Sequence, residues 1–171
     1  MKSRKIAVAA LIASLTFAGG LVSAVMTFPH PVPELEQRAD AAQAITWTTD
    51  LKKALADAKA QNKYVFVDVY TDWCGWCKKL DRDVFTDADM VSYLGEKYIC
   101  VKMDAEGSKE NEKVAEDARV TGYPAGLVFK GDGKLIGKLG GYMEAAQYKA
   151  SLEEVLARSA KDPNYDPRND E

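Results

Sequence analysis

Two cysteines separated by two residues, Cys74 and Cys77, are the residues of this chain best placed for covalent chemistry. A mainly apolar run, 64–70, leads into them, and a helix-compatible segment, 78–85, follows. A thiol at the start of a helix faces unpaired backbone N–H groups and the positive end of the helix dipole, and both favour the thiolate. Cys77 can lie on the same helical face as Cys74 and within bridging distance of it. This context indicates a redox-active pair.

Three other interpretations of these cysteines are open. A zinc site usually needs four Cys or His ligands, but the chain has three cysteines and one histidine, His30, which lies in a proline-rich segment. A structural disulfide across so short a loop would contribute less than the roughly 3 kcal/mol expected for a 15-residue loop. The third interpretation is a pair of unpaired core thiols. Redox chemistry is favoured over all three, and we expect no metal.

The N-terminus has the pattern of an export signal. Residues 1–5 are basic, residues 6–17 are apolar, and Val22-Ser23-Ala24 places small residues where signal peptidase cuts. We therefore expect residues 1–24 to be a signal peptide. The alternative is an uncleaved membrane anchor, because residues 6–28 form an uncharged run long enough to span a bilayer. Either arrangement exports the domain to a compartment where disulfides form and persist.

Length and composition allow one folded domain after this segment. Residues 25–44 contain three prolines and few large apolar side chains, so we expect a linker there. The domain is predicted to span residues 45–160, and the charged, proline-containing residues 161–171 to form a disordered tail. The apolar fraction of 47% suits a globular core. The formal net charge of −3 argues against nucleic-acid binding, which needs a basic patch.

Hydrophobic periodicity predicts alternating helices and strands. Apolar residues recur at helical spacing from Leu51, after Thr48 or Thr49 as the expected cap, whereas 64–70 suits a strand covered on both faces. The predicted strands are 45–47, 64–70, 98–103, 125–129 and 135–139, and the predicted helices are 51–61, 78–85, 87–94, 109–118 and 144–159. This order implies an α/β fold in which helices flank a mixed β-sheet on both faces.

From about Ile45 to Ser159 the chain resembles the thioredoxin superfamily. The stretch Trp73-Cys74-Gly75-Trp76-Cys77-Lys78 is similar to the active-site turn of that family. Asp68 falls six residues before Cys74, where thioredoxins place a buried carboxylate, and Tyr123-Pro124 is similar to the family's cis-proline loop. The motif looks most like that of exported thioredoxin-like domains, such as the soluble domain of periplasmic disulfide reductases. The resemblance implies a thioredoxin-like fold.

The resemblance also implies catalytic roles for three residues. Cys74 would be the attacking thiolate, exposed at the helix start, and Cys77 would resolve the mixed disulfide. Asp68 would act through water as the base that deprotonates Cys77. The competing interpretation of Asp68 is an idle carboxylate at an edge or in a loop, although an acid inside an apolar strand needs a reason.

Substrate contacts are implied at two other places. Trp73 and Trp76 would form an apolar rim around the thiols, and Tyr123-Pro124 would pair with an extended substrate chain through backbone groups. Two positions depart from the family pattern. Trp76 stands where thioredoxins usually have proline and strong oxidants have histidine, which leaves the redox potential open. Ala125 stands where thioredoxins often have threonine, which leaves the substrate contacts open.

Three further residues have simpler expected roles. Cys100 lies inside a predicted strand between apolar neighbours and is expected to be a small buried hydrophobe. Trp47 is expected to fill the core. Lys78 is either a solvated helix residue or an aid to the Cys74 thiolate.

The sequence therefore predicts a thiol–disulfide oxidoreductase that reduces disulfides in exported proteins. The Cys74–Cys77 disulfide is expected to be its redox group, with no other cofactor. Expected partners are exported cysteine-containing proteins and a membrane electron-donor protein, and the chain is expected to be a monomer in a bacterial periplasm. The alternatives are a non-catalytic thioredoxin-fold module that binds or chaperones other chains, and an electron donor to a peroxidase.

Overall fold

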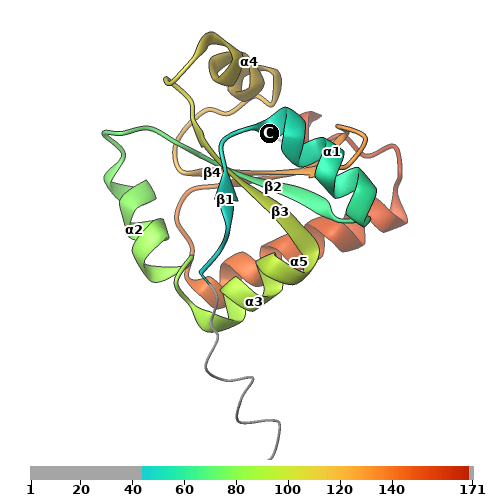
Figure 1. Ribbon diagram of the computed structural model, residues 1–171, viewed down its shortest axis with the longest axis horizontal. Coiled ribbons are helices and arrows are strands. Elements are labelled where there is room, and N and C mark those ends of the chain that lie inside the picture. The colour runs from blue at the N-terminus through green and yellow to red at the C-terminus, as the bar shows by residue number, and fades with distance from the viewer. Residues whose placement is uncertain (1–43, 170–171) are drawn as a thin grey trace, which may run out of the picture.

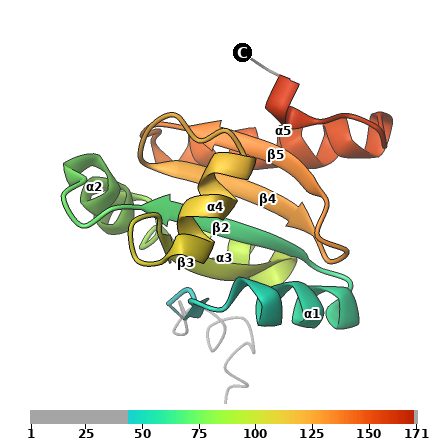
Figure 2. The same ribbon diagram turned by 90° about the horizontal axis from the view of Figure 1, so that it is seen from above.

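The computed structural model describes residues 44–169 of the chain. Within this range the strands form one five-stranded sheet in the order β1-β3-β2-β4-β5 (Figure 2). The strands are β1 (Trp47–Thr48), β2 (Tyr64–Tyr70), β3 (Tyr98–Asp104), β4 (Ala125–Lys130) and β5 (Leu135–Gly140). β3 is parallel to β1 and β2, whereas β4 is antiparallel to β2 and β5. The predicted mixed sheet is confirmed.

Helices cover both faces of the sheet (Figure 1). Buried residues of α1 and α4 contribute to the core on one face, and those of α2, α3 and α5 to the core on the other. The helices are α1 (Leu51–Gln61), α2 (Gly75–Asp83), α3 (Ala88–Lys97), α4 (Lys109–Asp117) and α5 (Ala145–Lys161), followed by the short 3₁₀ helix η1 (Pro167–Asn169). This is the predicted α/β architecture.

The central strand β2 separates the two cores. Val65, Val67 and Val69 are fully buried in the core beneath α1 and α4, whereas Phe66 is buried in the core beneath α2, α3 and α5. Because successive side chains of a strand point to opposite faces, Asp68 points to the same face as Phe66. A carboxylate is therefore buried on the face that also carries α2.

The cap of α1 and the start of α2 differ from the prediction, although α1 has the predicted bounds. Asp50, and not Thr48 or Thr49, caps α1, because its carboxylate accepts the Lys53 N–H at 2.8 Å. Thr48 belongs to β1 instead. The helix α2 begins at residue 75, three residues earlier than predicted, because the residue before it supplies the cap with its own sulfur.

The C-terminal segment is ordered against the domain, so the prediction of a disordered tail is wrong for residues 161–169. The residue at position 161 still belongs to α5, and Pro167 of η1 is buried. The Arg119 side chain donates to the Arg168 carbonyl at 2.9 Å, and the Lys134 ammonium donates to the Pro163 carbonyl. These contacts hold the segment on the domain despite the charges and prolines on which the prediction rested.

The predicted signal peptide, the alternative anchor and all but the last residue of the predicted linker lie outside the described residues, as do residues 170–171. Between residues 44 and 169, the helices are too short or too polar to cross a membrane.

Candidate active site

The Cys-x-x-Cys turn follows β2 and opens α2. Cys74 is the N-cap of α2, and its sulfur accepts the backbone N–H of Cys77 at 3.0 Å. The Cys74 N–H in turn donates to the Thr71 carbonyl at 3.1 Å, which fixes the turn. Cys74 and Cys77 form a disulfide with their Cα atoms 5.3 Å apart. A sulfur in this position faces the free N–H groups of the first helical turn, which stabilise a thiolate once the bond is reduced.

Cys74 is only 4% exposed, so the expectation of an exposed sulfur is wrong for this disulfide form. The physical reason is that the sulfur is bonded to Cys77 and directed onto the first turn of α2, where the Cys77 amide donates to it. The large apolar side chains of the motif that do face solvent are the two tryptophans.

Each cysteine of the pair is preceded by an exposed tryptophan that packs on a tyrosine from another loop. Trp73 is 67% exposed, and its ring meets Tyr123 edge to face with centroids 5.9 Å apart. The Trp73 Nε1 also donates to the Glu106 carboxylate at 3.1 Å. Trp76 is 60% exposed and packs on Tyr142 with centroids 5.6 Å apart. The predicted apolar rim is therefore extended by two tyrosines.

The sheet brings the proline loop beside the cysteine turn. β2 and β4 are antiparallel, with Val69 opposite Ala125. Pro124 therefore lies just before β4 starts, at the end of the sheet where β2 leads into the Cys-x-x-Cys turn. The Tyr123–Pro124 peptide bond is cis. The Gly141 N–H donates to the Pro124 carbonyl at 2.9 Å, which ties the loop after β5 to the same place.

Asp68 is fully buried and paired, which contradicts the interpretation of an idle edge carboxylate. The Lys102 ammonium lies 2.5 Å from Asp68 Oδ2 and also donates to the Asp81 carboxylate. Among the described residues, Asp68 Oδ1 has no hydrogen-bond partner. Burial raises the pKa of Asp68 to about 6, even though the Lys102 charge acts to lower it. The carboxyl group can therefore accept or release a proton near neutral pH.

Lys102 was not singled out from the sequence, although a signal was present. It interrupts the second buried strand just as Asp68 interrupts the first, and the parallel register of β2 and β3 places the two residues opposite each other. Burial alone would lower the pKa of Lys102, but the two carboxylates outweigh it and the net shift is upward. Its ammonium also lies 5.1 Å from the Trp47 ring, and Trp47 packs on the core as expected.

The remaining predicted residues take no part in the cysteine pair. Cys100 is a free thiol, 3% exposed, and burial raises its pKa to about 12. Lys78 is exposed on α2. No group of three or more His, Cys, Asp or Glu side chains gathers to hold a metal ion among residues 44–169.

A family described as "Thioredoxin-like domain" matches residues 51–156 of the chain. That match covers strands β2 to β5, the cysteine turn and the proline loop. The chain belongs to the thioredoxin-like domain family.

Curated relatives of this thioredoxin-like chain include the thiol:disulfide interchange protein DsbD of Klebsiella pneumoniae, which is 28% identical over 86% of this chain and 25% of the relative. The DsbD protein of Pseudoalteromonas atlantica is 32% identical over 63% of this chain and 18% of the relative. The chain thus spans a quarter or less of the length of these two relatives.

Solved structures agree with the thioredoxin-like fold. A thioredoxin from Thermus thermophilus superposes with a TM-score of 0.61 at 20% identity, covering 71% of this chain and 96% of that one. The C-terminal domain of DsbD from Neisseria meningitidis, in its oxidised form, gives a TM-score of 0.54 at 23% identity, covering 64% of this chain and 98% of that one. At these identities the likeness concerns the fold.

A Cys-x-x-Cys disulfide at a helix N-terminus, within a thioredoxin-like domain, makes this chain a thiol–disulfide oxidoreductase. The prediction of that class from the sequence is confirmed, and its relatives are named for thiol–disulfide interchange.

Proposed function

We propose that this chain reduces disulfides of proteins in the bacterial periplasm, with Cys74 as nucleophile and Cys77 as resolving thiol. The observation that carries the proposal is the position of Cys74 as the N-cap of α2, beside the proline loop. The helix N-terminus stabilises the Cys74 thiolate more than that of Cys77, which lies inside the helix. Export is supported by the basic and apolar pattern of residues 1–24.

The reaction needs two exchange steps. In the reduced protein, the Cys74 thiolate attacks one sulfur of the client disulfide, and the other client sulfur leaves as a thiolate. A mixed disulfide now joins Cys74 to the client. The Cys77 thiolate then attacks the Cys74 sulfur, and the second client sulfur leaves. The client gains two electrons, the cysteine pair loses two, and the two client thiolates take protons from solvent.

Asp68 serves the second step in this scheme. Cys77 is buried, so its thiol must lose a proton inside the protein before it attacks. A carboxylate with a pKa of about 6 on the same face of the sheet accepts that proton through water at neutral pH. Lys102 holds the charged carboxylate in place.

Client binding is assigned to the loop before β4 and to the exposed tryptophans. The backbone at Tyr123 precedes the β2–β4 ladder, which begins at Ala125, so an extended client segment can pair with it there. Trp73 and Trp76, one before each cysteine, offer exposed aromatic surface to the client.

The proposed direction of electron flow rests on Trp76. A histidine before the second cysteine helps to stabilise the thiolate in strong oxidants, whereas tryptophan carries no charge. The reduction potential should therefore lie nearer the roughly −270 mV of thioredoxin than the roughly −120 mV of the strong periplasmic oxidant. A reductant in an oxidising compartment needs a supply of electrons, so a membrane electron-donor protein is the proposed partner.

Two measurements test this function. The purified domain, recycled by dithiothreitol, should accelerate the reduction of insulin, and a redox titration against glutathione should give a potential near that of thioredoxin. Absence of insulin reduction would contradict the enzyme assignment. A potential above about −150 mV would make the protein an oxidase instead.

A further inference from the structure

Tyr142 lies between the cysteine turn and the proline loop of the candidate active site. It was not predicted from the sequence as a site residue. Its ring packs on Trp76 with centroids 5.6 Å apart, next to the cysteine turn. It follows Gly141, whose N–H donates to the Pro124 carbonyl at 2.9 Å. The short segment 141–142 therefore contacts both the helix that carries Cys77 and the proline loop.

The backbone turn in this segment depends on a glycine. Gly141 has φ of +77°, in the left-handed region that a side chain disfavours. The turn ends β5 and directs the next residue toward α2. This turn places the Tyr142 backbone beside α2, where its ring packs on Trp76.

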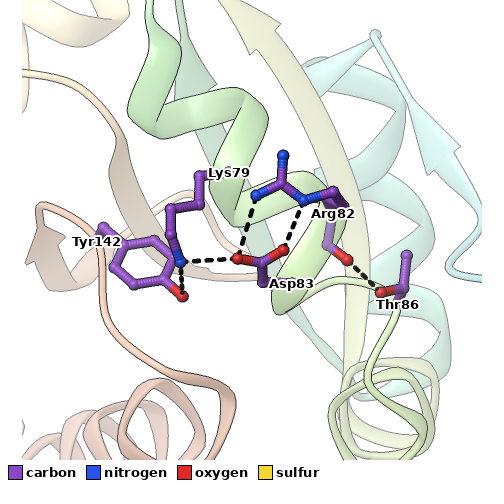
Figure 3. A network of polar contacts seen from close by, with 5 residues as sticks. All are labelled: Lys79, Arg82, Asp83, Thr86 and Tyr142. Atoms are coloured by element: carbon purple, nitrogen blue, oxygen red, sulfur yellow. Dashed lines mark hydrogen bonds and ion pairs between the residues drawn. The ribbon is translucent and has the colours of Figure 1, made fainter.

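A lysine from α2 holds the ring in place (Figure 3). The Lys79 ammonium donates to the Tyr142 hydroxyl at 2.7 Å and to Asp83 Oδ2 at 2.7 Å, and it lies 3.9 Å from the centre of the Tyr142 ring. Arg82 donates to the other oxygen of Asp83 at 2.8 Å. Lys79 and Asp83 are paired with each other, and Trp76 beside the half-buried Tyr142 ring is 60% exposed, so the Trp76–Tyr142 pair offers aromatic surface to a partner next to this charged network.

We propose that Tyr142 determines specificity in the exchange reaction. Its ring binds an apolar side chain that lies next to the half-cystine of the client. The proposal rests on the proposed function, because the client must approach Cys74 between the proline loop and the cysteine turn. A client segment paired with the backbone at Tyr123 passes beside the Trp76–Tyr142 pair, since Gly141 links Tyr142 to Pro124. An aliphatic or aromatic side chain there loses water against two rings that are already held in place.

The test compares two disulfide-bridged peptides of the same sequence, except that the residues flanking one half-cystine are leucine in one peptide and glycine in the other. Single-turnover rate constants for reduction by the reduced full-length protein are measured by acid quench and chromatography. The wild-type protein should reduce the leucine peptide five- to tenfold faster than the glycine peptide. Tyr142→Ala should bring the ratio within twofold of one, while Tyr142→Phe, which keeps the ring and loses the hydroxyl, should retain at least half of the preference.

A matched control is available at the far end of α5. Tyr165 also accepts a hydrogen bond from a cation, Arg158 Nη1 at 2.7 Å, but Arg158 lies roughly 20 Å along the helix from its start, which follows Tyr142 closely. Tyr165→Ala should keep the wild-type ratio. Trp76→Ala removes the other half of the pair from an exposed position and should lose the preference, even if Tyr142→Ala fails to fold.

The outcomes separate this inference from the proposed function. A wild-type protein that reduces neither peptide overturns both. A wild-type protein that reduces both peptides equally fast overturns only the role of Tyr142, as does a preference that survives in the folded Tyr142→Ala and Trp76→Ala variants.

Discussion

Asp68 and Lys102 are register partners on the parallel strands β2 and β3, with the Lys102 ammonium 2.5 Å from Asp68 Oδ2. The pair lies on the face of the sheet that carries α2, and the carboxyl group nevertheless keeps a pKa of about 6 because burial outweighs the lysine. An ion pair beneath the cysteine helix can therefore gain and lose its negative charge near physiological pH. Stability and catalysis should both reflect this titration.

The stability of the protein should fall as pH rises through the titration of Asp68. The pKa is higher in the folded state than the ordinary value of 3.8, so between these values the folded protein holds a proton that the unfolded chain releases. The free energy of unfolding therefore drops by roughly 2 kcal/mol from pH 4 to pH 7 on account of this group. Urea unfolding of wild type and Asp68→Asn at pH 4 and pH 7 measures this drop. The contributions of other titratable groups cancel when the unfolding free energy of the variant is subtracted from that of wild type. Asp72→Asn, at an exposed carboxylate, is the control, and a difference independent of pH would contradict the assignment.

The pH dependence of the exchange rate should also follow the titration of Asp68. Below about pH 6 the Asp68 carboxyl is protonated and cannot accept the Cys77 proton, so single-turnover reduction of a client should slow on that side. The inflection should be absent in Asp68→Asn, whose rate at pH 7 should be lower by roughly a hundredfold or more. Stopped-flow rates from pH 5 to pH 8 provide the measurement. An unchanged profile in the variant would assign Asp68 a purely structural role.

The two cysteines of the turn should behave differently when each is replaced. Cys74→Ser should abolish disulfide exchange, whereas Cys77→Ser should accumulate mixed disulfides, because the first step proceeds and the second cannot. Non-reducing gel electrophoresis of client mixtures distinguishes the two variants, in a Cys100→Ala background that removes the third thiol. Faster alkylation of Cys77 than of Cys74 by iodoacetamide at neutral pH would reverse the roles.

The Cys100 thiol should be unreactive in the folded protein. Its thiol is 3% exposed with a pKa raised to about 12, so it should react with Ellman's reagent only after unfolding in guanidinium chloride. Cys100→Ala should leave exchange rates intact and cost about 1 kcal/mol of stability, because a small cavity forms in the core. Loss of turnover in this variant would indicate a third redox thiol.

Replacement of two different glycines by alanine should change the stability of the protein in opposite directions. A Cβ at Gly126, opposite Asp68 on β4, would lie 2.5 Å from the Tyr148 hydroxyl and 3.0 Å from the Phe66 ring, so Gly126→Ala should cost roughly 1–3 kcal/mol. A Cβ at Gly95 in α3 meets nothing within 4 Å, and Gly95→Ala should gain up to about 1 kcal/mol. Thermal unfolding of both variants compares them, and equal effects would contradict the packing described around Gly126.

Local sequence patterns were sufficient for most of the fold. The strand predicted over 64–70 is β2 with the same bounds, because its apolar run is buried on both faces. The helix predicted to begin at Lys78 begins at Gly75 instead. The reason is that cysteine is not among the usual N-cap residues, although the Cys74 sulfur accepts a backbone N–H as a capping oxygen would.

Contacts between segments far apart in the chain were harder to predict from the sequence. Lys102 meets Asp68 only once the register of β2 and β3 is known, and no local pattern fixes that register. Tyr142 reaches Trp76 only because the chain turns at Gly141. In both cases the residue types were visible in the sequence, but their partners depend on how strands far apart in the chain align.

The C-terminal segment has a consequence for association between copies of the chain. It leaves α5 on one face of the sheet, where Arg158 bonds Tyr165, and reaches Arg119 at the end of α4 on the other face, so it passes around the outer strand β5. An outer strand without such a cover offers unpaired backbone groups to another chain. Ending the protein after Lys161 should therefore expose β5 and favour strand-to-strand aggregation.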